Sequence, residues 1–122
     1  MKRLLLILIP FILSAQEDFI SHYEYGEMLY ANPRGVSCAQ CHGNSGEGRV
    51  IVSYKDVDGK QVLSGADIRK KSLKEMIYSV NSYHKVMPRY YLTDEEVKAI
   101  YDYLQIKNSH YLSKLQKNNT SK

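Results

Sequence analysis

The sequence predicts a small all-α domain with three main helices and a short β-hairpin insertion. Apolar residues recur at helical spacing in three separate segments. Two of these segments start with Ser or Thr followed three residues later by Glu, which is the pattern of a capping box. The chain has 122 residues, of which 43% are hydrophobic, and this length suits one domain with a modest core.

The N-terminal segment has the features of an export signal. Two basic residues precede an apolar run over 4–13, and Ala15 ends a small-residue cleavage site. The run is too short to span a bilayer comfortably, so residues 1–15 are expected to be a signal peptide. Gln16 follows where a lipoprotein would carry a cysteine, so no lipid anchor is expected. The chain is therefore predicted to be periplasmic without a stable membrane anchor; an uncleaved anchor is the alternative.

The first helix is expected to begin near the acidic pair Glu17 and Asp18, because negative charge favours a helix N-terminus. Aromatic and small residues, among them Gly26 and Tyr30, follow at helical spacing. Pro33 is expected to end the helix just before a pair of cysteines.

A loop and a β-hairpin are expected after the cysteines. Residues 43–48 are rich in Gly, Asn and Ser, a composition typical of loops. The segments 50–54 and 61–63 flank Asp58-Gly59, which favours a hairpin turn.

The second and third helices are marked by their capping boxes. Ser72 with Glu75 starts the second helix, and Thr93 with Glu96 starts the third. The loop between them contains a Met-Pro pair.

The domain is expected to cover residues 16–107, followed by a polar, basic C-terminal tail over 108–122. The composition of that tail predicts a frayed end. The formal net charge of the whole chain is only +4, and no nucleic-acid partner is implied.

The run Cys38-Ala39-Gln40-Cys41-His42 contains the only two cysteines of the chain, and its pattern is typical of c-type haem attachment. The two thiols lie about one helical turn apart, so both can form thioethers with one porphyrin. His42 is then placed to be the proximal iron ligand. One covalent haem c per chain is predicted, with Cys38, Cys41 and His42 in the binding site.

Two other uses of the cysteines, a redox dithiol and a zinc site, fit the sequence less well. A redox dithiol usually opens a helix after a buried strand, whereas the segment before Cys38 has a helical period. Structural zinc needs four ligands, and the chain adds to its two thiols only histidines at unhelpful distances: His22, His84 and His110.

The ligand at the sixth position of the iron decides whether a haem protein transfers electrons or reacts with a bound molecule. Met87 is the favoured ligand, because Pro88 biases it towards an extended backbone that suits a loop crossing the haem face. Met28 and Met76 are expected to pack in the core. His84 as the ligand would preserve electron transfer but lower the reduction potential. The full set of candidates is Met28, Met76, Met87, His22, His84 and His110.

Taken together, these features resemble the class I monohaem cytochromes c over about Glu17 to Ile106. The resemblance rests on these residues: Gly26, Tyr30, Cys38, Cys41, His42, Met87, Pro88, Ile100, Tyr103 and Leu104. It implies the cytochrome c fold, in which the first and last helices cross at Gly26, with His42 and Met87 as axial ligands. Many members have a proline soon after the histidine, and this chain has none. A carbonyl near Gly46 or Gly48 is therefore expected to orient the His42 ring.

The resemblance further implies a soluble one-electron carrier, with no catalytic residues required. Its partners would be redox proteins, such as a membrane-bound oxidase, a reductase or a peroxidase, and the chain itself would be a monomer. A haem sensor or ligand-binding enzyme with an open sixth position is the alternative. A fixed haem subunit of a larger redox complex is another.

Overall fold

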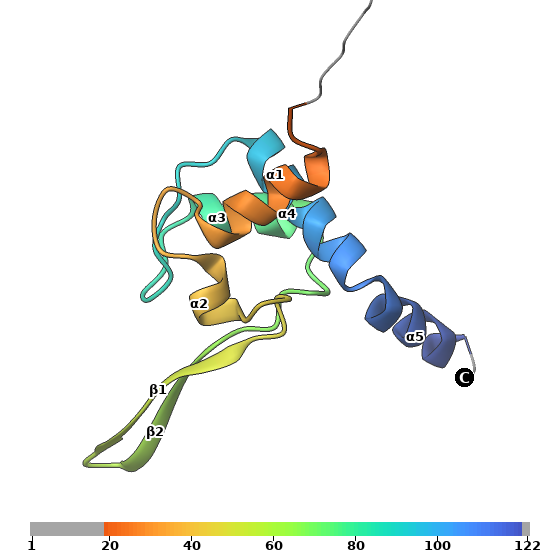
Figure 1. Cartoon of the computed structure of the whole chain (residues 1–122). Coiled ribbons are helices and arrows are strands. Elements are labelled where there is room, and N and C mark those ends of the chain that lie inside the picture. The colour runs from red at the N-terminus through yellow and green to blue at the C-terminus, as the bar shows by residue number, and fades with distance from the viewer. Residues whose placement is uncertain (1–18, 121–122) are drawn as a thin grey trace, which may run out of the picture.

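The computed structural model describes residues 19–120, and the predicted signal peptide over 1–15 lies outside the described residues. Within them the fold is mostly helical with one hairpin, as predicted (Figure 1). Two helices, α2 and α5, add to the three that the sequence indicates. No helix within this range is long and apolar enough to cross a membrane. In chain order the elements are α1 (His22–Ala31), α2 (Cys38–His42), β1 (Arg49–Asp56), β2 (Gly59–Gly65), α3 (Leu73–Asn81), α4 (Asp94–Lys107) and α5 (Ser109–Asn119).

Helices α3 and α4 begin where their capping boxes predict. The Ser72 hydroxyl accepts a hydrogen bond from the Glu75 amide, and the Glu75 carboxylate accepts one from the Ser72 amide. Thr93 and Glu96 make the same reciprocal pair at the start of α4. These interactions satisfy backbone donors that a helix N-terminus would otherwise leave unpaired.

The predicted start of α1 is wrong. The helix begins at His22, and Ser21 caps it in a capping box with Glu24. Glu17 and Asp18, the predicted start, precede the described residues. The capping box prevails because it satisfies specific amides, whereas acidic residues alone supply only a weaker electrostatic preference.

Helices α1 and α4 cross closely, and the core lies around this crossing (Figure 1). A Cβ atom added to Gly26 would lie 2.1 Å from the Ala99 carbonyl oxygen and 2.8 Å from the Tyr103 Cβ. Only a glycine permits this approach. The crossing predicted at Gly26 is therefore confirmed. The buried apolar residues are Leu29, Tyr30, Met76, Val80, Tyr90, Leu92, Val97, Ala99, Ile100, Tyr103 and Leu104.

A bidentate ion pair fixes the segment that leads from α1 to α2. The two terminal nitrogens of Arg34 each lie 2.8 Å from an oxygen of Glu96, and Arg34 adopts a left-handed φ of 61°. The Arg34 guanidinium is the main reason that the pKa of Glu96 falls to about 2. Glu96 thus both caps α4 and holds the approach to the cysteine motif.

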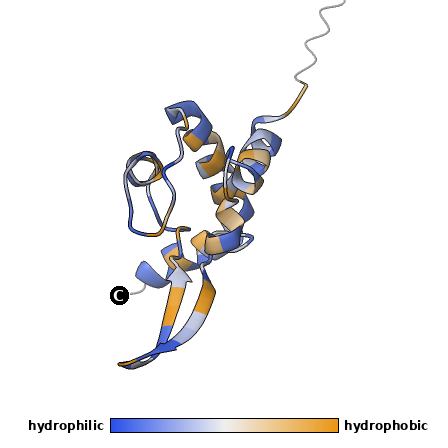
Figure 2. Cartoon of the chain, turned by 90° about the vertical axis from the view of Figure 1, so that its left-hand side faces the viewer, coloured by the Kyte–Doolittle hydropathy of each residue, from blue (hydrophilic) through white to orange (hydrophobic). Residues whose placement is uncertain are grey.

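The hairpin is confirmed and is longer than predicted. Strands β1 and β2 pair antiparallel from Arg49↔Gly65 to Asp56↔Gly59, with an irregularity between Val50 and Val52. The hairpin projects from the helical body (Figure 1), and hydrophobic residues lie along both of its strands (Figure 2). The tip of the hairpin is exposed, and its base, which includes Gly65, is the part that contacts α2.

The expectation of a frayed end is wrong for α5. The chain continues as a helix beyond Asn108, whose buried side-chain amide donates to the carbonyl oxygens of Leu104 and Ser45, both at 2.8 Å. The Arg69 guanidinium carbon lies 3.8 Å from the centre of the Tyr111 ring. These contacts hold the start of α5 against the domain, which composition alone does not reveal.

Candidate functional site

Helix α2 carries the whole cysteine motif. Cys38 and Cys41 are half-buried and form no disulfide with each other, and they are three residues apart in this short helix. Side chains with that spacing lie on one helical face. The helix ends at Gly43, whose φ of 81° is the left-handed conformation that favours glycine.

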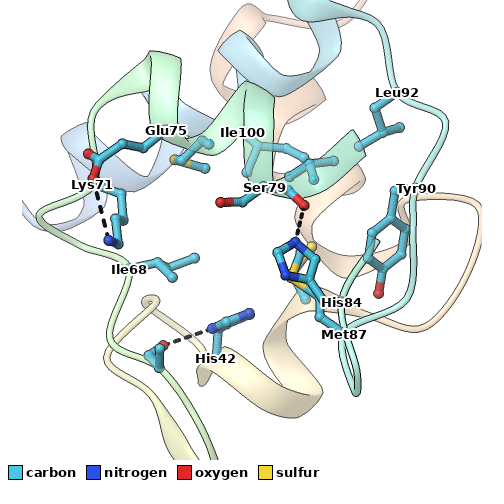
Figure 3. Close-up of a pocket in the computed structure, with 14 residues that line it drawn as sticks. His42, Ile68, Lys71, Glu75, Ser79, His84, Met87, Tyr90, Leu92 and Ile100 are labelled. Atoms are coloured by element: carbon cyan, nitrogen blue, oxygen red, sulfur yellow. Dashed lines mark hydrogen bonds and ion pairs between the residues drawn. The ribbon is translucent and has the colours of Figure 1, made fainter. Parts of the chain in front are cut away.

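The His42 ring is oriented by a backbone carbonyl. Its Nδ1 lies 2.8 Å from the carbonyl oxygen of Ala66. Because a carbonyl can only accept, Nδ1 carries the proton and Nε2 keeps its lone pair. The nitrogen that is not bonded to Ala66 points into a pocket (Figure 3). His42 is therefore held in the tautomer that a metal ligand requires.

The expected carbonyl near Gly46 or Gly48 is wrong, because both glycines are used to fold the loop. The Gly48 amide donates to the His42 carbonyl at 2.7 Å, and the Gly46 carbonyl accepts from the Ile68 amide at 2.8 Å. This pairing brings the chain that follows the hairpin alongside α2. Ala66 reaches His42 as a result.

Gly65, the last residue of β2, touches α2 directly. A Cβ atom at this position would lie 1.7 Å from the carbonyl oxygen of Cys41 and 2.4 Å from its carbonyl carbon. The absence of a side chain thus sets the distance between the hairpin and the cysteine motif. Sequence reasoning missed this residue, because no turn or left-handed φ marks it.

Two adjoining cavities open next to α2, with volumes of about 180 and 240 Å³. The walls are mainly apolar and come from the hairpin base, α2, α3, α4 and the loop between α3 and α4 (Figure 3). The second cavity also includes Cys41, so all four predicted site residues line one or both of two cavities that share part of their walls. Both cavities share Cys38, His42, Ala66, Met87 and Tyr90.

The other sixth-ligand candidates divide into two groups. Met76 and His84 line the first cavity, and Met76 is buried as expected. Met28 is 55% exposed, so its predicted core packing is wrong. His22 and His110 are exposed and line neither cavity.

The loop that carries Met87 is fastened at both ends. The Asn81 side chain donates to the Leu92 carbonyl at 3.1 Å and accepts from the Leu92 amide at 3.3 Å. The Tyr90 hydroxyl donates to the Val36 carbonyl at 2.6 Å, which joins the loop to the segment before Cys38. Sequence reasoning did not identify Asn81 or Tyr90 in this role. A polar residue at the end of an amphipathic helix is the only available signal for Asn81.

The family model described as "Cytochrome C oxidase, cbb3-type, subunit III" matches residues 22–104. The chain belongs to this family of c-type cytochrome domains. Its cofactor is a covalently bound c-type haem. The resemblance to class I c-type cytochromes is thereby confirmed. Comparisons with curated proteins and with solved structures found no match.

The cavities of this cytochrome domain fit such a cofactor. Their apolar walls suit a porphyrin face, two cysteine side chains border them, and the oriented His42 offers a lone pair.

The environment of Cys38 differs from that of a redox dithiol. Burial is the main cause that raises the pKa of the Cys38 thiol to about 11. Reactive dithiols require the opposite shift, because the thiolate is the nucleophile. Within residues 19–120, no three His, Cys, Asp or Glu side chains gather around a potential metal site.

Tyr30 connects the core of the cytochrome domain to the end of α2. Its hydroxyl donates to the Gly43 carbonyl at 2.6 Å, and both residues are buried. Burial is also the main cause that raises the pKa of the Tyr30 phenol, so the hydroxyl keeps its proton. Gly43, the residue that follows His42, is therefore held to α1 by a hydrogen bond.

Tyr30→Phe is expected to lower the free energy of unfolding by about 0.5–1.5 kcal/mol, because the buried Gly43 carbonyl would lose the closer of its two donors and keep only the Gly46 amide at 3.4 Å. Urea unfolding of the holoprotein, followed by far-ultraviolet circular dichroism, measures this change. Tyr78→Phe is the matched control, since Tyr78 is 73% exposed and a surface change should stay within about 0.5 kcal/mol. Equal effects of the two substitutions would contradict the assigned role of Tyr30.

Proposed function

We propose that this cytochrome domain is a one-electron carrier with His42 and Met87 as the two axial ligands. Cys38 and Cys41 would form the thioethers, and no other cysteine exists in the chain. The observation that carries the proposal is that His42, with its Nε2 lone pair available, and Met87 line the same two cavities. The bound haem supplies a ferric/ferrous couple, which both imidazole and thioether can ligate.

The polar residues of the first cavity favour a carrier over an enzyme. The Glu75 carboxylate accepts from the amide and hydroxyl of Ser72, and it also pairs with Lys71 at 3.4 Å. These contacts use Glu75 as a helix cap, with no need for a proton-transfer role. The remaining walls are mainly apolar, so few wall dipoles have to reorient when the charge on a bound haem changes.

Met87→Ala tests the proposal. Oxidised wild-type holoprotein is expected to show the far-red charge-transfer band of a sulfur-to-iron bond, and the substitution should abolish it. The reduction potential should fall on the order of 0.2 V, since axial ligands set haem potentials over roughly 0.8 V. Visible spectra and potentiometric titration measure both effects.

Met28→Ala is the matched control, because Met28 is exposed and lies outside both cavities. It should keep the band and the potential. A wild-type protein without the band, or a band that survives in Met87→Ala, would refute His/Met ligation.

We further propose that this domain acts in the periplasm, after export, with a membrane-bound oxidase as its redox partner. The description of the matching family supports an oxidase, and the sequence features of residues 1–15 support export. Co-purification with an oxidase at a fixed ratio would identify a bound subunit, whereas recovery as a monomer would identify a shuttle.

A further inference from the structure

The loop between α3 and α4 places another residue with the chemistry of an iron ligand in the first cavity, besides Met87. His84 and Met87 lie on the same loop, three residues apart, and both line this cavity. Figure 3 shows the two side chains next to each other on one side of the cavity, and His42 below and to the left of them. This loop thus offers an imidazole and a thioether to the space that His42 faces, whereas Met76 of α3 lines the same cavity as a buried residue of the core.

The His84 ring has one nitrogen prepared for ligation. Its Nε2 lies 2.7 Å from the Ser79 carbonyl oxygen, and it must donate to that acceptor. The lone pair is then on Nδ1, which has no hydrogen-bond partner among residues 19–120. This arrangement parallels His42, where a carbonyl also holds one ring nitrogen and leaves the other as a ligand.

The loop can present either residue without unpacking the helices. Asn81 and Tyr90 fasten it on either side of the segment that contains His84 and Met87. Between these points Tyr83 is 89% exposed and Val86 is 55% exposed, so the segment has few buried contacts to lose. A segment of this kind rearranges at low free-energy cost.

We propose that His84 is an alternative sixth ligand, which binds the iron when the Met87 thioether does not. This inference rests on the proposed function, in which His42 and Met87 are the resting ligands. In the exchange the iron–sulfur bond breaks and an iron–nitrogen bond forms, with no net oxidation or proton transfer. Methionine as an axial ligand raises the reduction potential of a haem. The His84-ligated state therefore has a lower reduction potential than the Met87-ligated state.

The other histidines are placed differently. His22 lies 2.8 Å from Asp102 on the α1 and α4 surface, and His110 is exposed on α5. Neither lines a cavity next to His42. His22 therefore provides a matched control.

The experiment compares three variants of the oxidised holoprotein by electron paramagnetic resonance and visible spectroscopy. Met87→Ala should remain low-spin, with the signals of two imidazole ligands. Met87→Ala with His84→Ala should become high-spin, and Met87→Ala with His22→Ala should remain low-spin. If His84 occupies about nine-tenths of the reduced Met87→Ala protein, that variant should bind carbon monoxide about tenfold more weakly than the His84 double variant.

Added imidazole should return the His84 double variant to the low-spin state, because it restores the missing ligand. The proposal is overturned if Met87→Ala alone is high-spin, if the His22 change abolishes the low-spin state, or if added imidazole fails to restore it. A wild-type spectrum without the sulfur band would instead refute the proposed function. A wild-type band lost in a high-spin Met87→Ala protein would refute only the role of His84.

Discussion

Gly65→Ala is expected to disrupt the haem site and to destabilise the fold by at least about 2 kcal/mol. The new methyl group would overlap the Cys41 carbonyl, whose oxygen lies 1.7 Å from the position of the added Cβ. The Cβ position is fixed by the backbone at residue 65 and the Cys41 carbonyl is itself backbone, so no side-chain rotation can relieve the overlap. The end of β2 must move away from α2, and the Ala66 carbonyl that follows must leave His42.

The loss of that hydrogen bond has a redox consequence. A carbonyl that accepts from Nδ1 increases the basicity of the imidazole, and a more basic ligand favours the ferric state. Gly65→Ala should therefore raise the reduction potential while it lowers stability. Potentiometric titration and guanidinium unfolding of the holoprotein measure the two effects.

Val62→Ala is the matched control for this substitution. Val62 lies on the same strand and is 52% exposed, so the change should cost below about 1 kcal/mol and leave the potential unchanged. A Gly65→Ala protein with wild-type stability and potential would show that the hairpin does not hold α2 in place.

Gly26→Ala is expected to lower the free energy of unfolding by about 2 kcal/mol or more. Overpacking usually costs about 1–3 kcal/mol, and here the added Cβ would lie 2.1 Å from the Ala99 carbonyl oxygen. Alanine is favoured over glycine inside a helix by about 1 kcal/mol, so part of the steric cost is offset. Guanidinium unfolding followed by circular dichroism measures the net effect.

Met28→Ala serves as the control on the same helix, because this side chain is exposed and away from the crossing. Its effect should stay within about 0.5 kcal/mol. If Gly26→Ala were as stable as the wild type, α1 and α4 could separate without cost, and the close crossing would not contribute to stability.

The sequence predicted those features that depend on neighbouring residues. Ser72 with Glu75 and Thr93 with Glu96 satisfy amides within one helical turn, so their sequence pattern is sufficient. Ser21 and Glu24 show the same capping-box pattern, and they mark the start of α1 more accurately than the acidic pair Glu17 and Asp18. Asp58-Gly59 located the hairpin turn for the same local reason.

Features that depend on distant residues escaped prediction. The carbonyl that orients His42 belongs to Ala66, 24 residues further along the chain, and any residue type offers a carbonyl. Asn81 fastens the Met87 loop through Leu92, a contact that no periodic pattern reveals. The helix α5 is stabilised at its start by Asn108 and Arg69, whereas its composition indicated only a polar tail.

The place where the hairpin meets α2 limits how the chain can change in length. At the turn near Gly59, extra residues would extend an exposed tip and leave the rest of the molecule unchanged. One extra residue just before Gly65 would instead shift the strand by one position, reverse the side that each following group faces, and turn the Ala66 carbonyl away from the imidazole. Insertions are therefore tolerable at one end of this hairpin and disruptive at the other.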